Sequence, residues 1–259
     1  MEKMNSFNSW SSIINFNGYI EVILPIYSPI TDELIFYADF SNNVIISGLW
    51  KNLVTNTAYG TKNVTYMNPG YRIGSTSTSG YLGITMNNSV QVETLFFVIN
   101  IPLSGTSGSV LYLQSCNDQL RGPADGRYFA IFRSGSAYYL STSTNYAADI
   151  RSSNTFNLLY DTKYLITITR ASNLSCPLSR LNGKTIGGSQ FNMPTTMNTV
   201  NPNLGNYIGV RNIGQNGASL YIPYILYEFE IYNSNLTLTQ IKQMEQYLIN
   251  KWSIDPNII

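Results

Sequence analysis

The chain has 259 residues, of which 11% are charged, and fifteen basic against fourteen acidic side chains leave a net charge of +1. Without a run of lysine or arginine, this balance disfavours nucleic acid and anionic membranes as electrostatic partners. There is no histidine, which excludes histidine-dependent nucleophilic sites and imidazole metal sites; we therefore expect a protein that is not an enzyme and has no resident cofactor.

Residues 1–30 predict an N-terminal arm or an extra strand. A polar start gives way to a β-prone run over 19–24, and prolines follow at positions 25 and 29. Neither a secretory signal nor a transmembrane helix is indicated, because no long uninterrupted apolar stretch is present. We expect synthesis in the cytoplasm without a signal peptide.

Residues 31–259 predict one all-β domain. Short apolar or alternating runs are separated by clusters of Gly, Asn, Ser and Pro at roughly 8 to 15 residues, which is typical of a β-sandwich. The expected strands cover residues 34–40, 81–84, 93–101, 110–114, 128–133, 137–142, 163–170, 207–210 and 225–232.

The two cysteines, Cys116 and Cys176, leave two alternatives open. They are compatible with free thiols and with one disulfide, and the absence of a cysteine framework favours free thiols. A chain of this length can bury a sizeable core without a disulfide.

The end of the chain changes to a helical pattern. Thr237 is placed as the N-cap, and Gln240 three residues later completes a capping box. An apolar face at helical spacing follows and is expected to pack inward. This face consists of Ile241, Met244, Leu248 and Trp252. A single amphipathic helix therefore closes an otherwise β chain.

The closing segment, EFEIYN followed by LT and YLINKWSI, resembles the end of laminin-G-like modules of the concanavalin A-like lectin/glucanase superfamily. Three earlier segments resemble strands of these modules and occur in the same order: ELIFYADF at 33–40, KYLITITR at 163–170 and NYIGV at 206–210. Asn182-Gly183 is similar to their hairpin turn, and Asn-Gly is also the preferred dipeptide of a type I′ turn. The resemblance implies a two-sheet antiparallel jelly-roll sandwich with one short C-terminal amphipathic helix.

Glu228 and Glu230 raise the catalytic alternative. Residues two apart in a strand point to one face about 6.6 Å apart along the chain, near the separation that glycoside hydrolysis uses. The glucanases of the superfamily carry a strand motif that resembles E-x-D-x-E. Residues 228–232 of this chain have no central Asp and no third carboxylate. The laminin-G-like ending implies that Glu228 has a structural role near the terminal helix and that Trp252 holds this helix in place. Hydrolysis stays a remote alternative.

The loop from Asn117 to Arg127, with Tyr138, is the candidate ligand-binding region. Asn117, Asp118 and Asp125 offer oxygen ligands of the kind that calcium takes, but there is no EF-hand spacing and nearby arginines offset the charge. A plain solvated loop is the alternative. Tyr138 can stack on a sugar, and ordinary sandwich packing is its alternative.

These features favour binding over catalysis. Modules that resemble this one are common among virion proteins of large viruses and phages, which implies a structural or decoration protein of a virion that contacts capsid proteins or copies of itself. Its N-terminal arm could add a strand to a neighbouring sheet. The alternative is a lectin-like module that attaches to host-surface glycans, because a neutral surface rich in Tyr and Asn suits sugars.

Overall fold

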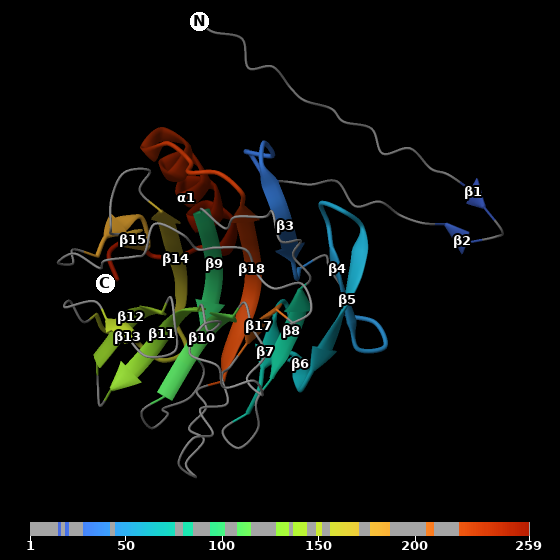
Figure 1. Ribbon diagram of the computed structural model, residues 1–259, viewed down its shortest axis with the longest axis horizontal. Coiled ribbons are helices and arrows are strands. Elements are labelled where there is room, and N and C mark those ends of the chain that lie inside the picture. The colour runs from blue at the N-terminus through green and yellow to red at the C-terminus, as the bar shows by residue number, and fades with distance from the viewer. Residues whose placement is uncertain are drawn as a thin grey trace, which may run out of the picture.

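In the computed structural model, the described strands gather into sheets and a helix follows near the C-terminus (Figure 1). The described residues are 15–16, 19–20, 28–41, 45–75, 80–84, 94–101, 108–114, 128–134, 137–143, 149–151, 156–170, 177–186, 206–209 and 223–258. The elements are β1 (Asn15–Phe16), β2 (Tyr19–Ile20), β3 (Leu34–Asp39), β4 (Leu49–Asn52), β5 (Thr57–Lys62), β6 (Val64–Tyr66), β7 (Tyr71–Ile73), β8 (Tyr81–Ile84), β9 (Thr94–Asn100), β10 (Gly108–Gln114), β11 (Tyr128–Ser134), β12 (Ala137–Ser143), β13 (Asp149–Arg151), β14 (Lys163–Arg170), β15 (Pro177–Leu181), β16 (Lys184–Thr185), β17 (Asn206–Gly209), β18 (Tyr224–Tyr232) and α1 (Leu238–Trp252).

Two antiparallel sheets pack face to face, which confirms the predicted sandwich with one C-terminal helix. The helix-side sheet has the order β16-β15-β14-β9-β18-β7-β6, with β3 also paired to β18. The second sheet has the order β13-β12-β11-β10-β17-β8-β5-β4. Neighbours in both sheets are often far apart in sequence, as expected where chain segments cross repeatedly between two sheets.

The core lies between the sheets, and a second apolar layer lies beneath α1. Because side chains alternate along a strand, β9 serves both layers. Phe97 faces the second sheet, where its ring lies 6.1 Å from that of Phe229 on β18. Phe96 and Val98 face the opposite way and pack in the layer under the helix. This burial on both faces explains why β9 is apolar along nearly its whole length.

A β-bulge in β18 determines which side chains face the helix. Leu226 pairs with Ile99 and Glu228 pairs with Val98, so Tyr227 is an extra residue in the ladder. A bulge of this kind re-aims the residues that follow it. Tyr227 packs in the layer beneath α1, and Glu228 bonds to residues of the helix on the same side of the sheet.

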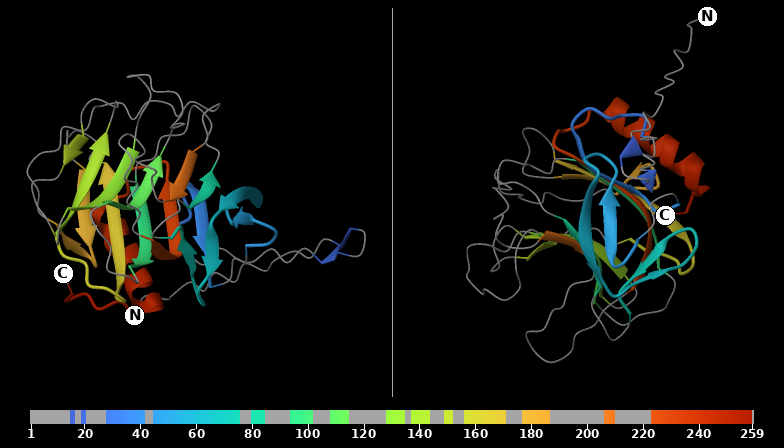
Figure 2. Two further views of the ribbon diagram at one scale, coloured as in Figure 1. Left: turned by 90° about the horizontal axis from the view of Figure 1, so that it is seen from below. Right: turned by 90° about the vertical axis from the view of Figure 1, so that its right-hand side faces the viewer.

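The helix begins and ends with well-formed caps. Thr237 and Gln240 form the expected capping box, in which the Gln240 amide N–H donates to Thr237 and the Thr237 amide N–H donates to the Gln240 side chain at 2.9 Å. Ser253 ends the helix in the left-handed conformation, as C-terminal cap residues often do. The buried face includes Ile241, Leu248 and the other expected residues, and it lies on the helix-side sheet (Figure 2).

Several strands were not expected from the sequence, notably β4, β5, β6 and β7 between residues 49 and 73. They are short and carry many polar residues, so their alternation is weak. Trp50 and Ile73 nevertheless lie at 0% exposure in the core.

The described part of residues 1–30 contains a two-stranded hairpin. β1 and β2 pair with each other and belong to neither large sheet. Ser28 and Ile30, by contrast, are buried beside α1. The division of the chain at residue 30 stays a prediction, and these contacts show that residues 28–30 pack with the sandwich. No helix among the described residues has the length and apolarity that crossing a membrane requires.

Candidate functional site

Most of the predicted ligand-binding region lies outside the described residues. This holds for Asn117, Asp118, Asp125 and Arg127, and also for both cysteines. The calcium site and the state of the cysteines therefore stay predictions. Among the residues that the structure describes, no group of three or more carboxylate or thiol side chains is arranged to hold a metal ion.

Tyr138 lies in the core rather than at a ligand surface. Its side chain is 1% exposed and its ring stacks on Phe156 with the centroids 6.2 Å apart. The backbone N–H and C=O groups of the two residues also bond to each other, at 2.8 and 2.9 Å. Because strand alternation turns this ring toward the opposite sheet, Tyr138 cannot stack on a sugar here, and we correct that assignment.

Asn182-Gly183 forms the expected hairpin turn between β15 and β16. Their φ angles of 48° and 79° are those that a type I′ turn requires. The Asn182 side chain also accepts from the Leu165 amide at 2.9 Å and donates to the Asp255 and Ile258 carbonyls. The turn thus ties the C-terminal tail to the helix-side sheet.

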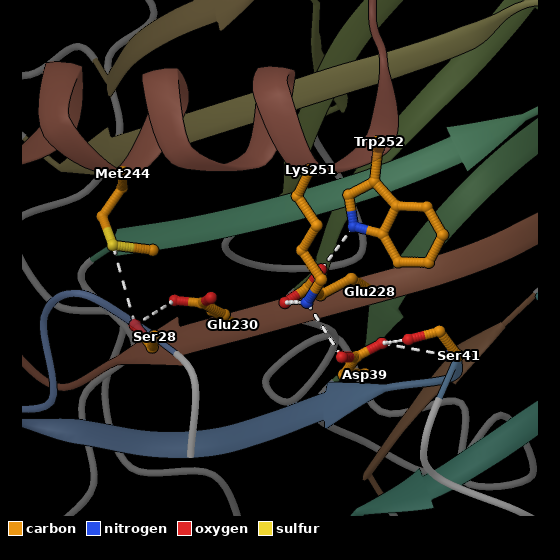
Figure 3. Close-up of polar contacts among 8 residues, drawn as sticks. All are labelled: Ser28, Asp39, Ser41, Glu228, Glu230, Met244, Lys251 and Trp252. Atoms are coloured by element: carbon orange, nitrogen blue, oxygen red, sulfur yellow. Dashed lines mark hydrogen bonds and ion pairs between the residues drawn. The ribbon is translucent and has the colours of Figure 1, made fainter. Parts of the chain in front are cut away.

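Beneath α1, three carboxylates on β3 and β18 form what we name the helix-facing carboxylate cluster, Asp39, Glu228 and Glu230 (Figure 3). Glu228 accepts hydrogen bonds from the Trp252 indole N–H and from the Lys251 ammonium, the latter at 2.9 Å. Lys251 also donates to Asp39 at 2.8 Å. Asp39 is directly opposite Glu228 in the strand pairing, so one lysine holds two carboxylates that the sheet places side by side.

Glu230 lies at the end of the cluster away from Lys251 (Figure 3). Its Oε2 accepts from the Tyr232 hydroxyl at 2.5 Å and from the Ser28 hydroxyl at 3.1 Å. Its Oε1 is buried, with no hydrogen-bond partner among the described residues. A protonated carboxyl suits these surroundings better than an anion, because two hydroxyl groups compensate a buried charge poorly.

Burial raises the pKa values of both glutamates. The pKa of Glu230 rises to about 8, and the nearby charge of Glu228 adds to the effect of burial. Burial raises the pKa of Glu228 to about 7, although the attraction of Lys251 opposes the rise. Burial alone would lower the pKa of Lys251, but Glu228 and Asp39 outweigh it and hold that pKa above its ordinary value.

The cluster can stabilise the helix, but it is badly placed for chemistry on a substrate. Glu228 and Glu230 are both 0% exposed, and the described hydrogen bonds of their carboxyl groups come from buried or half-buried side chains around the helix. A general acid or nucleophile must reach the bond that is cleaved. The geometry therefore gives no support to this pair as the catalytic residues of a glycosidase.

The outer face of the second sheet carries an exposed surface that the sequence analysis did not single out. Trp50 and Leu82 point into the core, so their neighbours along β4 and β8 face outward. We name as the β4–β5–β8 face the outward residues Ile46, Leu49, Gly60, Lys62, Tyr81 and Gly83. Its sequence signal is the absence of Asp and Glu from residues 40–92, which contain three basic residues.

Searches with family models and among curated proteins give no match. Solved structures do match. A Trypanosoma rangeli sialidase in complex with sialic acid superposes with a TM-score of 0.61 and 14% identity, over 87% of this chain and 36% of the sialidase chain. The binding domain of botulinum neurotoxin serotype D/C superposes with a TM-score of 0.56 and 16% identity, over 84% of this chain and 52% of the toxin chain.

A third structure, reported under the statement that cell entry of botulinum neurotoxin type C depends on interaction with two ganglioside molecules, gives a TM-score of 0.57 at 14% identity. It covers 84% of this chain and 52% of that chain. These likenesses establish a β-sandwich fold. The finer resemblance to laminin-G-like modules stays a proposal.

The comparisons correct the expectation that the chain is not an enzyme. The sialidase structures overlap most of this chain, so the fold occurs within chains of an enzyme. The lack of histidine was too weak a ground, because glycoside hydrolysis can use carboxylates or a tyrosine nucleophile and needs no imidazole. The likeness itself is one of fold, since it spans about a third of the sialidase chain.

Proposed function

We propose that this chain is a carbohydrate-binding, lectin-like domain that attaches to surface glycans. The observation that carries the proposal is the overlap of the sandwich with a sialidase solved with sialic acid and with a neurotoxin whose cell entry depends on gangliosides. Because fold alone does not assign function, the proposal also needs a surface suited to sugars. The low content of charged residues and the exposed rings of Tyr66 and Tyr160 supply such a surface.

Two described tyrosines are exposed, and an exposed ring is the kind of group that stacks on a sugar. Tyr66, at the end of β6, is 57% exposed. Its ring centroid lies 5.2 Å from that of Tyr71, and its hydroxyl donates to the Asn68 side chain at 3.0 Å. Tyr160, before β14, is 39% exposed. A ring held by such contacts loses little entropy when a ligand binds, which favours stacking.

A glycan array with the full chain tests the proposal. We expect reproducible binding to a restricted set of oligosaccharides, and weaker binding after Tyr66→Ala or Tyr160→Ala if that ring contacts the sugar. Leu238→Ala, which removes an exposed apolar side chain from α1, is the matched control and should leave binding unchanged. An array without reproducible signal, repeated at high protein concentration, would exclude this function.

The comparisons favour carbohydrate binding over the structural role in a virion that the sequence suggested. A role through protein contacts alone, with capsid proteins or further copies as partners, requires association of purified chains and no glycan signal. Sedimentation of the purified chain alongside the array separates the two roles. Self-association without glycan binding would favour the virion role.

A further inference from the structure

The charge of this protein is unevenly distributed along the chain. The whole chain is nearly neutral, but residues 40–92 hold Lys51, Lys62 and Arg72 and no acidic residue. This segment supplies β4 through β8, which include one end of the second sheet. β17 and β10, the next strands across that sheet, add no acidic residue either. This end of the second sheet therefore carries basic side chains and no acidic ones on its described strands.

Two lysines lie on the outer side of this region. Lys51 and Leu49 are two apart in β4, on either side of the core residue Trp50, so both face outward. Lys62 is exposed and pairs directly with Tyr81 across β5 and β8. Directly opposed side chains in a sheet lie about 5 Å apart at their Cβ atoms, so Lys62 and Tyr81 leave the sheet side by side.

Between these side chains the surface is open. Gly60 is exposed, and a Cβ added there would meet nothing within 4 Å. Gly83 lies beside it, since a Cβ on Gly83 would come within 3.0 Å of the Gly60 carbonyl oxygen. These two positions therefore leave bare backbone on the sheet next to Lys62 and Tyr81. The exposed side chain of Leu49, opposite Gly60, borders it on the other side.

We propose that the β4–β5–β8 face binds a carboxylate-bearing sugar at the end of a glycan. This inference rests on the proposed carbohydrate-binding function and adds its ligand class and its location. Tyr81 offers an aromatic surface for the apolar face of a sugar ring, the glycine pair lets the ring approach the sheet, and Lys62 pairs with the carboxylate. A segment without acidic side chains imposes no repulsion on such an anion.

The test compares 3′-sialyllactose with lactose by calorimetric titration of the full chain. Two substitutions probe the face. Gly60→Val covers the bare backbone with a branched side chain and causes no clash, because the position is open and its φ angle is not in the left-handed region. Lys62→Gln removes the charge and keeps most of the side-chain length. We expect Gly60→Val to weaken sialyllactose binding on the order of tenfold and Lys62→Gln about threefold, the latter less in high salt.

Matched controls make the same chemical changes elsewhere. Thr65→Val creates an exposed valine on β6 of the other sheet, and Lys242→Gln removes an exposed charge from the solvent side of α1. Both should bind sialyllactose like the unmodified chain. Equal melting temperatures of all four variants would show that loss of binding is not loss of fold.

The outcomes separate this inference from the proposed function. If lactose binds as tightly as sialyllactose, or if the two face variants bind normally, the carboxylate site is wrong while glycan binding stands. If no glycan binds, both fail. If glycan-free vesicles containing phosphatidylserine bind with the same sensitivity to Gly60→Val and Lys62→Gln, the face docks on an anionic membrane and the glycan assignment is wrong.

Discussion

Glu228 and Glu230 are two residues apart on one strand, yet their surroundings differ in charge. Lys251 and the Trp252 indole donate hydrogen bonds to Glu228, whereas the described donors to Glu230 are the hydroxyl groups of Ser28 and Tyr232. Both carboxyl groups are buried, so the difference between them comes from their partners rather than from solvent. In the folded protein, Glu230, with a pKa of about 8, therefore holds its proton to a higher pH than Glu228, with a pKa of about 7.

The first prediction concerns the pH dependence of stability. The folded state holds the Glu230 proton up to a pKa of about 8, whereas the unfolded chain releases it near the ordinary glutamate pKa of 4.5. This contribution is therefore complete below pH 4.5 and is lost as the pH rises toward 8. Glu230→Gln cannot titrate, so we expect its melting temperature to fall less than that of the unmodified chain between pH 5 and pH 8. If the melting temperatures of the two proteins, measured by thermal unfolding, fell equally between pH 5 and pH 8, the result would contradict this prediction.

The second prediction concerns the partner of Trp252 and Lys251. Glu228→Ala leaves the buried indole N–H without its acceptor and Lys251 with one carboxylate instead of two. Removal of one member of a buried ion pair is costly, and we expect a loss of about 3 kcal/mol in the free energy of unfolding, measured by urea denaturation. Lys242→Ala, on the solvent side of the helix, should stay within about 0.5 kcal/mol. Unchanged stability with altered activity on glycans would instead assign Glu228 a chemical role.

At the scale of elements, the C-terminal helix was the best-predicted part of the chain. Its caps and apolar spacing are local signals, and local signals survive in a sequence without knowledge of the fold. The strands β4 to β7 were missed because their sequences, such as TAYGTK and VTY, are short and polar. Pairing with neighbours in the sheets makes them strands, and pairing partners are not visible in local sequence.

The third prediction concerns the start of this helix. Thr237→Ala removes the side chain that accepts from the Gln240 amide, and one donor at the helix N-terminus loses its partner. We expect a loss of about 1 kcal/mol in the free energy of unfolding. Thr237→Ser keeps the hydroxyl and should recover most of it. Equal destabilisation by both changes would point to the lost methyl group rather than to the cap.

At the scale of the whole molecule, the order of strands brings distant segments together around β18. This strand pairs with β9 along nearly its whole length, with β3 near its C-terminal end and with β7 near its start. Residues 28–30 reach the same region, where Ser28 bonds to Glu230 and Tyr232. The sandwich therefore includes a few residues that the sequence analysis assigned to an N-terminal arm.

The fourth prediction compares two shortened chains. One begins at Ser28 and the other at Thr31, so they differ only by residues 28–30. We expect the chain that begins at Thr31 to melt roughly 5 °C lower, because it lacks the buried Ile30 side chain and the Ser28 hydrogen bonds. Differential scanning calorimetry measures the difference. Equal melting temperatures would place residues 28–30 outside the cooperative unit.

The sequence by itself determined the fold class, the final helix and its caps, and the Asn182-Gly183 turn. Each depends on the period of apolar residues or on a dipeptide with special backbone preferences, which are properties of short segments. Only the tertiary structure decided that Glu228 and Glu230 are buried beneath α1, that Tyr138 belongs to the core, and that Lys62, Tyr81 and Gly60 share one exposed face. Exposure and neighbourhood depend on which distant strands pair, because a side chain's environment comes from the whole sheet rather than from its own strand.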